Sequence, residues 1–122
     1  MLKDETIARV VKFRDDRAWR QFPTPKDLAI SMNLEAAELL ELFQWSGTDL
    51  ECAEKREKLR EELADVLSYC ILMADVCGFD LDEIMNEKVS KNEAKYPVEK
   101  AYGSAAKYTE FTEESYDNMG NV

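Results

Sequence analysis

Histidine is absent from this 122-residue sequence, and its absence excludes several kinds of active site. Glu-x-x-His di-iron centres, zinc sites with histidine ligands and serine–histidine triads all require an imidazole. The three cysteines, Cys52, Cys70 and Cys77, form an odd set without a Cys-x-x-Cys pair. We interpret Cys70 and Cys77, seven residues apart on one helical face, as small buried apolar residues rather than metal ligands.

Long apolar runs are scarce, and the 26 acidic residues outnumber the 16 basic ones. No apolar stretch approaches the roughly 20 residues of a membrane span, and the N-terminal residues lack a signal-peptide core. The net charge of −10 argues against a protein that coats DNA or RNA, because such binding comes largely from Lys and Arg neutralising phosphates. We therefore expect a soluble cytoplasmic protein with no membrane and no nucleic acid polymer as partner. A small phosphorylated ligand is compatible with this charge when cations mediate the contact.

The chain has only four glycines and three prolines, which leaves long stretches free to form helices. Apolar residues recur at helical spacing, and strand-like alternation is not convincing. Thr24 before Pro25 predicts a helix start, and Gly78 predicts a helix end. The spacing predicts four helices, over about residues 4–20, 25–44, 50–77 and from 80 up to Pro97. We therefore expect an all-α, four-helix bundle-like domain at residues 1–97 and a partly ordered, irregular C-terminal tail at residues 98–122.

Four acidic residues stand out because they face the expected core. At about 100° per residue, Glu35 falls inside the apolar stripe of its helix and Glu38 flanks it by roughly 60°. Glu62 and Asp65 repeat this arrangement on the next helix. The apolar residues within roughly 60° of Glu35 are Leu28, Met32, Leu39 and Leu42, and those around Glu62 are Leu59, Val66, Tyr69, Met73 and Val76.

Two converging pairs of carboxylates predict a metal site. Buried ionised carboxylates are costly unless cations accompany them, and oxygen ligands suit Mg²⁺ or Mn²⁺. The i, i+3 spacing lets both side chains of a helix share one ion. The alternative is that each pair lies at the edge of its stripe, in water. Two matching pairs on successive helices favour the metal site.

The pattern Glu35-Ala-Ala-Glu38 followed by Glu62-Leu-Ala-Asp65 resembles the ExxE…ExxD motif of the MazG-like nucleoside triphosphate pyrophosphohydrolases. The resemblance to their dCTP pyrophosphatase branch extends from about Phe13 to Phe111. The matching stretches are FRDDRAWRQFPTPKDL, ELLELFQW, REELADVLSY, KVSKNEAKYP and SAAKYTEF. Leu34 stands where the fuller EExxE form has a glutamate, which favours the dCTP pyrophosphatase branch.

The resemblance implies an enzyme that cleaves a nucleoside triphosphate between its α- and β-phosphates. The expected substrate is a dNTP, foremost dCTP or a modified dCTP, and the products are the monophosphate and pyrophosphate, an activity that cleans the nucleotide pool. By this similarity Glu35, Glu38, Glu62 and Asp65 hold Mg²⁺. One carboxylate of the catalytic pair Glu35 and Glu38 accepts the proton of the attacking water, and the sequence leaves open which one.

Substrate contacts follow from the same resemblance. Trp19, Trp45 and Tyr69 occupy positions similar to the base pocket of the family, where aromatic faces stack on a nucleobase; the alternative for each is ordinary core packing. Lys88 and Asn92, four residues apart on the fourth helix, suit phosphate and sugar contacts, although Lys88 can also extend into solvent.

Two further features concern the periphery of the expected site. Lys95 and the tail residues Lys107 and Tyr108 are candidates for contacts with the site of a neighbouring subunit. Family members often carry a histidine on the pocket face of the first helix, and this chain has none, which leaves base selectivity open.

The third helix predicts a homo-oligomer because its apolar residues do not keep to one face. Leu63, Leu67, Ile71 and Ala74 lie away from the Glu62 stripe, and a helix that is apolar all round must be covered on both sides. The resemblance implies a homotetramer built as a dimer of dimers. The alternative is that the tail folds back over this face.

Two other functions stay open at this stage. One is a related all-α enzyme acting on dUTP or phosphoribosyl-ATP. The other is a catalytically silent helical interaction protein.

Overall fold

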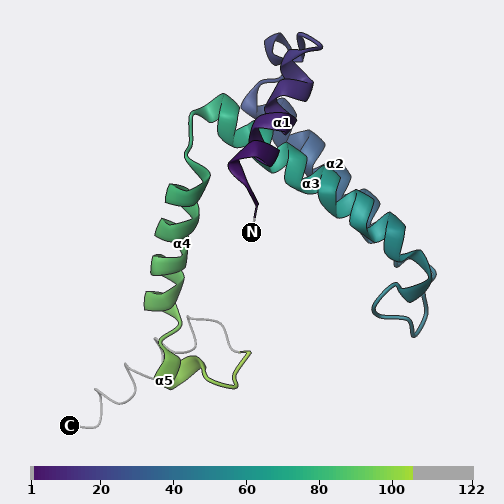
Figure 1. The fold of residues 1–122 in the computed structure, drawn as a ribbon. Helices are drawn as coiled ribbons and strands as arrows, with labels where there is room; N and C mark the ends of the chain where they lie inside the picture. The colour runs from purple at the N-terminus through teal and green to yellow at the C-terminus, as the bar shows by residue number, and fades with distance from the viewer. Residues whose placement is uncertain (1, 106–122) are drawn as a thin grey trace. The chain divides into compact units, whose positions relative to one another are not determined.

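The computed structural model describes residues 2–105, and every regular element among them is a helix (Figure 1). The α-helices are α1 (Asp4–Asp15), α2 (Pro25–Glu41), α3 (Arg56–Cys77), α4 (Leu81–Lys95) and α5 (Val98–Ala101), and the 3₁₀ helices are η1 (Trp19–Gln21) and η2 (Ala53–Lys55). The predicted all-α fold is confirmed. None of these helices has the length and apolar character needed to cross a bilayer.

The contacts divide the chain into two units, Met1–Leu81 and Asp82–Val122. The first unit holds α1, α2 and α3 with both 3₁₀ helices. The second holds α5 and, apart from its first residue, α4. Each unit is described by itself below.

The start of α2 is fixed by a capping box. The backbone N–H of Asp27 donates to the Thr24 hydroxyl over 3.2 Å, and the backbone N–H of Thr24 donates to the Asp27 carboxylate over 3.0 Å. Pro25 occupies the first turn, where its missing N–H costs nothing. The predicted start at Thr24 and Pro25 is therefore confirmed.

The first helix is shorter than predicted. It ends at Asp15 rather than near Arg20, because Ala18 adopts a left-handed conformation with φ 54° and ψ 32°. A left-handed residue interrupts a right-handed helix. The chain then turns into η1, and the side-chain amide of Gln21 donates to the Ala18 carbonyl over 2.9 Å. Because of this turn, Trp19 lies in η1 rather than in a continuation of α1.

The third helix also starts later than predicted, at Arg56 instead of near Leu50. Cys52 stands in a left-handed conformation with φ 53° and is buried, and its Sγ lies 3.8 Å from the Leu42 carbonyl oxygen. The buried Cys52 therefore holds the loop before α3 in a non-helical conformation. The predicted end at Gly78 is confirmed, with φ 69°.

Two other predicted boundaries move by a few residues. The second helix ends at Glu41, and α4 ends at Lys95, two residues before Pro97. The segment that we predicted to be an irregular tail begins with the short helix α5. Residues 106–122 of that tail, including Lys107 and Tyr108, lie outside the described residues.

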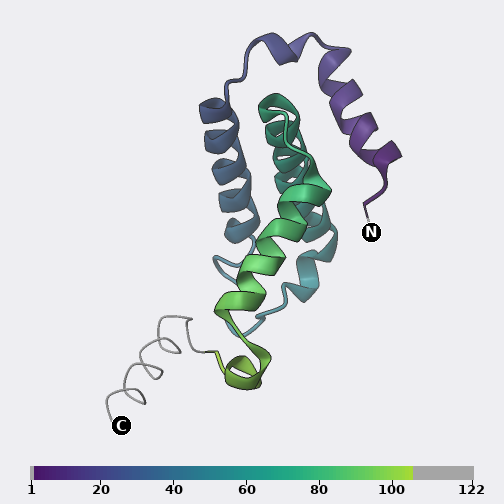
Figure 2. The same ribbon diagram turned by 90° about the vertical axis from the view of Figure 1, so that its left-hand side faces the viewer.

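Packing in the first unit centres on α2 and α3, which lie side by side in both views (Figures 1 and 2). Leu28 of α2 and Ile71 and Ala74 of α3 are buried, and α1 packs against α3. Ile71 and Ala74 belong to the face that we predicted a neighbouring subunit would cover, so that half of the face is already buried within the chain. Leu63 and Leu67 of the same face are 50% and 48% exposed.

The cysteines are free thiols. Cys70 and Cys77 are half-buried, with their sulfur atoms 4.0 Å from Met32 Sδ and 3.8 Å from Met73 Sδ. These contacts agree with the interpretation of both residues as small apolar side chains.

Candidate functional site

Two facing helices bring the four predicted carboxylates together. Glu35 and Glu38 lie one turn apart on α2, and Glu62 and Asp65 lie one turn apart on α3. One carboxylate oxygen from each of Glu35, Glu62 and Asp65 lies within 4.8 Å of the other two. Glu38 joins this acidic cluster, since it lies close enough to Glu35 and Glu62 for both to act on its pKa. The helical wheel thus placed these side chains on the surfaces that meet.

The acidic cluster contains polar atoms that the described residues leave unsatisfied. Oε2 of Glu35 and Oε2 of Glu62 are buried and have no hydrogen-bond partner among residues 2–105. A buried carboxylate oxygen without a donor or cation is costly. These two atoms therefore indicate that something is still to be bound between α2 and α3.

The neighbouring carboxylates raise the pKa values of Glu38 and Glu62. A hydrogen bond to Glu35 raises the pKa of Glu38, and charge repulsion from Glu35 adds to this effect. Burial raises the pKa of Glu62, and repulsion from Glu38 and Asp65 raises it further, against a smaller opposing effect of Lys58. Lys58 itself forms an ion pair with Glu61, 3.5 Å away on the solvent side.

A hard divalent cation fits this donor set. All four residues offer oxygen atoms, which Mg²⁺ and Mn²⁺ prefer. A cation would satisfy the two buried oxygens and remove the repulsion that raises the carboxylate pKa values. The chemistry of the acidic cluster therefore agrees with the predicted metal site, and the role of each ligand stays a prediction.

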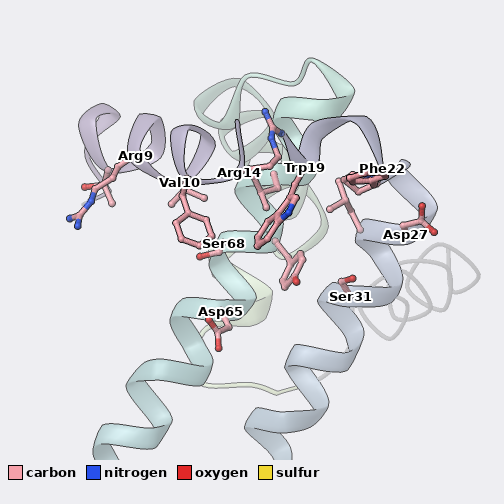
Figure 3. Close-up of a pocket in the computed structure, with 15 residues that line it drawn as sticks. Arg9, Val10, Arg14, Trp19, Phe22, Asp27, Ser31, Asp65 and Ser68 are labelled. Carbon is pink, nitrogen blue, oxygen red and sulfur yellow. The ribbon is translucent and has the colours of Figure 1, made fainter. Parts of the chain in front are cut away.

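A cavity of about 790 Å³ lies next to the acidic cluster, between α1, η1, α2 and α3 (Figure 3). Asp65 belongs to both, so the cavity adjoins the carboxylates. Ser31 of α2 and Ser68 of α3 line it from the two facing helices. The full lining is Thr6, Arg9, Val10, Phe13, Arg14, Trp19, Phe22, Pro23, Asp27, Leu28, Ser31, Asp65, Ser68, Tyr69 and Leu72.

Aromatic side chains form much of the cavity wall. Trp19 meets Phe13 edge to face, with ring centroids 5.9 Å apart and planes at 75°. The guanidinium of Arg17 lies over the Phe13 ring, with Cζ 3.7 Å from the ring centroid. Trp19 is 48% exposed and Tyr69 is half-buried. A partly exposed ring on a cavity wall suits stacking on a flat ligand.

Other predicted contact residues lie elsewhere. Trp45 follows α2, is 88% exposed and does not line the cavity. Lys88, Asn92 and Lys95 lie on α4, in the second unit. Their contacts with substrate stay predictions.

Several cavity residues were not among the sequence predictions, notably Phe13, Phe22, Ser31 and Arg14. The position of Arg14 could have been predicted from the sequence. Ile7, Val10, Val11 and Arg14 follow helical spacing, which puts the arginine on the apolar face of its helix. The positions of Phe22 and Ser31 depend on the turn at Ala18 and on the packing of α1, which no local pattern encodes.

The described residues define an all-α protein in which two paired helices gather four carboxylates beside one aromatic cavity. The chain belongs to the MazG-like family, whose family model matches residues 30–111. This match continues past residue 97, where we had placed the end of the domain. It leaves out α1 and Trp19.

Individual relatives agree with this assignment. The chain is 39% identical over 113 residues to dCTP pyrophosphatase 1 of Homo sapiens and 38% identical over 112 residues to that of Mus musculus. Each match covers 87% of this chain and 66% of the relative, so the chain spans about two thirds of the length of these proteins. A crystal structure of a pyrophosphatase from Archaeoglobus fulgidus is similar with a TM-score of 0.69 and 43% identity, over 77% of this chain and 91% of that one.

Proposed function

We propose that the chain is a divalent-metal-dependent nucleoside triphosphate pyrophosphohydrolase that acts on dNTPs, foremost dCTP or a modified dCTP. The observation that carries this proposal is the shared position of Asp65, which belongs to the acidic cluster and also lines the aromatic cavity. A nucleotide has the matching shape, with a flat base at one end and a charged triphosphate at the other.

The similar proteins support the proposed substrate. Those named dCTP pyrophosphatase 1 share nearly two fifths of the aligned residues, and the similar solved structure is a pyrophosphatase. The cavity of about 790 Å³ lies within the usual size range of small-molecule sites. Its Trp19 and Tyr69 walls suit a nucleobase, whereas the carboxylates suit a metal-bound triphosphate.

The proposed reaction is hydrolysis of the bond between the α-phosphorus and the oxygen that bridges to the β-phosphate. The oxygen of the attacking water bonds to the α-phosphorus while the bridging oxygen leaves with pyrophosphate, and the protons of the water are released, which gives the monophosphate and pyrophosphate. Glu35, Glu38, Glu62 and Asp65 would hold the metal, Mg²⁺ or in its place Mn²⁺. A bound divalent cation supplies charge neutralisation for the triphosphate and a lower pKa for the attacking water.

The remaining chemistry belongs to the side chains of this chain. Glu38 is the most exposed of the three glutamates in the cluster, and it is a candidate to accept the proton of the attacking water. Glu35, which raises the pKa of Glu38, is the second candidate. Trp19 and Tyr69 would orient the base, so that the triphosphate extends toward Asp65.

Release of pyrophosphate from a panel of canonical and modified dNTPs, with and without Mg²⁺, tests this function. Glu35→Gln and Asp65→Asn should abolish turnover and keep the helical circular dichroism spectrum. Glu61→Gln is the matched control, since Glu61 lies next to Glu62 but is exposed, and it should retain normal turnover. Near-normal rates in Glu35→Gln or Asp65→Asn would contradict the proposal.

The same panel separates the two other functions. A preference for dUTP or phosphoribosyl-ATP would indicate a related all-α enzyme with another substrate. No metal-dependent release from any nucleotide would indicate a helical interaction protein.

A further inference from the structure

The helix that forms one wall of the cavity is anchored by a charged residue. Residue Arg14, in the last turn of α1, is only 2% exposed, and it is the buried residue of that helix among those described. The apolar residues of the same face, Ile7, Val10 and Val11, are only half-buried. The attachment of α1 therefore differs from that of an ordinary amphipathic helix, where apolar residues are the most buried.

Two carboxylates hold the buried guanidinium. Nη2 of Arg14 donates to Oδ2 of Asp75 on α3 over 2.7 Å, and Nε donates to Oδ1 of Asp15 over 2.9 Å. Burial lowers the pKa of Arg14, but the hydrogen bonds to Asp75 and Asp15 outweigh it and the net pKa is raised. Asp75 is 33% exposed, so this ion pair is largely withdrawn from solvent. Removing one partner of a buried ion pair is strongly destabilising, because it leaves the other charge buried and unpaired.

The pair joins the two sides of the cavity. Thr6, Val10 and Phe13 of α1 and Trp19 of η1 form one side, and the opposite side belongs to α2 and α3. Ion pairs elsewhere, such as Lys12 with Asp16 or Arg60 with Glu57, join residues close together in the chain. The Arg14–Asp75 contact instead spans 61 positions.

The guanidinium is not directed at the ligand space itself. Figure 3 shows the Arg14 side chain pointing away from the Trp19 ring, although the residue lines the cavity. Its effect on a ligand must therefore be indirect, through the position of α1 and of the turn that carries Trp19.

We propose that Arg14 and Asp75 are positioning residues, which hold α1 and η1 against α3. They thereby fix the aromatic wall of the cavity, formed by Phe13 and Trp19, on which the base stacks. The inference rests on the proposed nucleotide function for its kinetic part. It predicts that loss of the ion pair loosens the grip on the base but leaves the carboxylates and their chemistry in place. The effect should therefore appear in KM rather than in kcat.

The test uses variants of the full chain. Asp75→Asn removes the charge and keeps the shape, whereas Arg14→Lys keeps the charge and loses the forked geometry. Lys12→Ala is the matched control, because it breaks an exposed ion pair of α1. With pyrophosphate release as the assay, Asp75→Asn should raise KM by about tenfold, as expected when stacking of an aromatic ring on the base is weakened, and leave kcat nearly unchanged. Arg14→Lys should give a smaller increase, and Lys12→Ala none.

A second measurement needs no turnover. The chain has two tryptophans, so Trp45→Phe leaves Trp19 as the reporter. In that background, Asp75→Asn should increase acrylamide quenching of Trp19 in the nucleotide-free protein, and Lys12→Ala should not. Should Asp75→Asn fail to fold, Arg14→Lys provides the same comparison.

The outcomes separate this inference from the proposed function. If no nucleotide is hydrolysed, the function fails, and the Trp19 quenching still decides whether the pair holds the wall. If hydrolysis occurs but Asp75→Asn leaves KM and quenching unchanged, the positioning role is refuted and the function stands. A loss of kcat at constant KM would likewise refute the positioning role.

Discussion

Ala18 holds strain that a single substitution should release. Its φ of 54° and ψ of 32° lie in the left-handed region, where a residue with a Cβ atom is disfavoured by roughly 1–2 kcal/mol. Glycine adopts this region without that cost. We therefore expect Ala18→Gly to stabilise the folded protein.

The magnitude is the difference between two effects. Removing the strain gains roughly 1–2 kcal/mol, while the greater freedom of glycine in the unfolded chain costs about 0.4–1 kcal/mol. The net gain is about 0.5–1 kcal/mol. At roughly 4 °C per kcal/mol for a chain of this size, the melting temperature should rise by about 2–4 °C.

Thermal denaturation followed by circular dichroism measures this shift. Ala37→Gly is the control, because Ala37 is exposed inside α2, and it should lose about 1 kcal/mol. Cys52 shares the left-handed conformation, with φ 53°, but its side chain is buried. Cys52→Gly should therefore not be stabilising, since the gain in backbone energy is offset by lost packing.

A lower melting temperature for Ala18→Gly, equal to that of Ala37→Gly, would refute this reasoning. It would mean that the turn before Trp19 is not left-handed in solution. The position of the aromatic wall would then need another explanation.

Three further predictions concern the acidic cluster, the aromatic residues and assembly. In metal-free protein, the raised pKa of Glu62 means that the folded state binds its proton more tightly than the unfolded chain, so stability should fall as the pH rises from about 4.5 through that raised pKa. Glu62→Gln should flatten this part of the curve of melting temperature against pH, and millimolar Mg²⁺ should raise the wild-type melting temperature at neutral pH; no change in either measurement would count against the metal site. Trp19→Ala should weaken nucleotide binding more than it lowers stability, and Trp45→Ala tests whether the second ring joins the pocket; tryptophan fluorescence that ignores saturating nucleotide would contradict stacking. Light scattering at micromolar concentration should give a homotetramer of the 14.1 kDa chain, since Leu63 and Leu67 stay half-exposed, and a mass near that of the monomer would exclude the oligomer.

Local signals in the sequence determine where the helices begin and end and which helix face carries the acidic residues. Thr24 with Pro25 and Gly78 mark helix ends through hydrogen bonding and backbone freedom that act within a few residues. Helical spacing alone places Glu35 and Glu62 on the apolar faces of their helices, and both possess a buried oxygen in the structure. The family motif depends on the same local spacing.

The tertiary structure decides what lies beside the acids. The left-handed conformations at Ala18 and Cys52 occur at residues other than glycine. The early end of α1 and the late start of α3 were therefore not predictable from the spacing of apolar residues and glycines. The cavity next to Asp65 exists because α1 packs across α3. That packing includes the pairing of Arg14 with Asp75, 61 positions away, and a contact between residues so distant in the chain is set by the whole fold rather than by local periodicity.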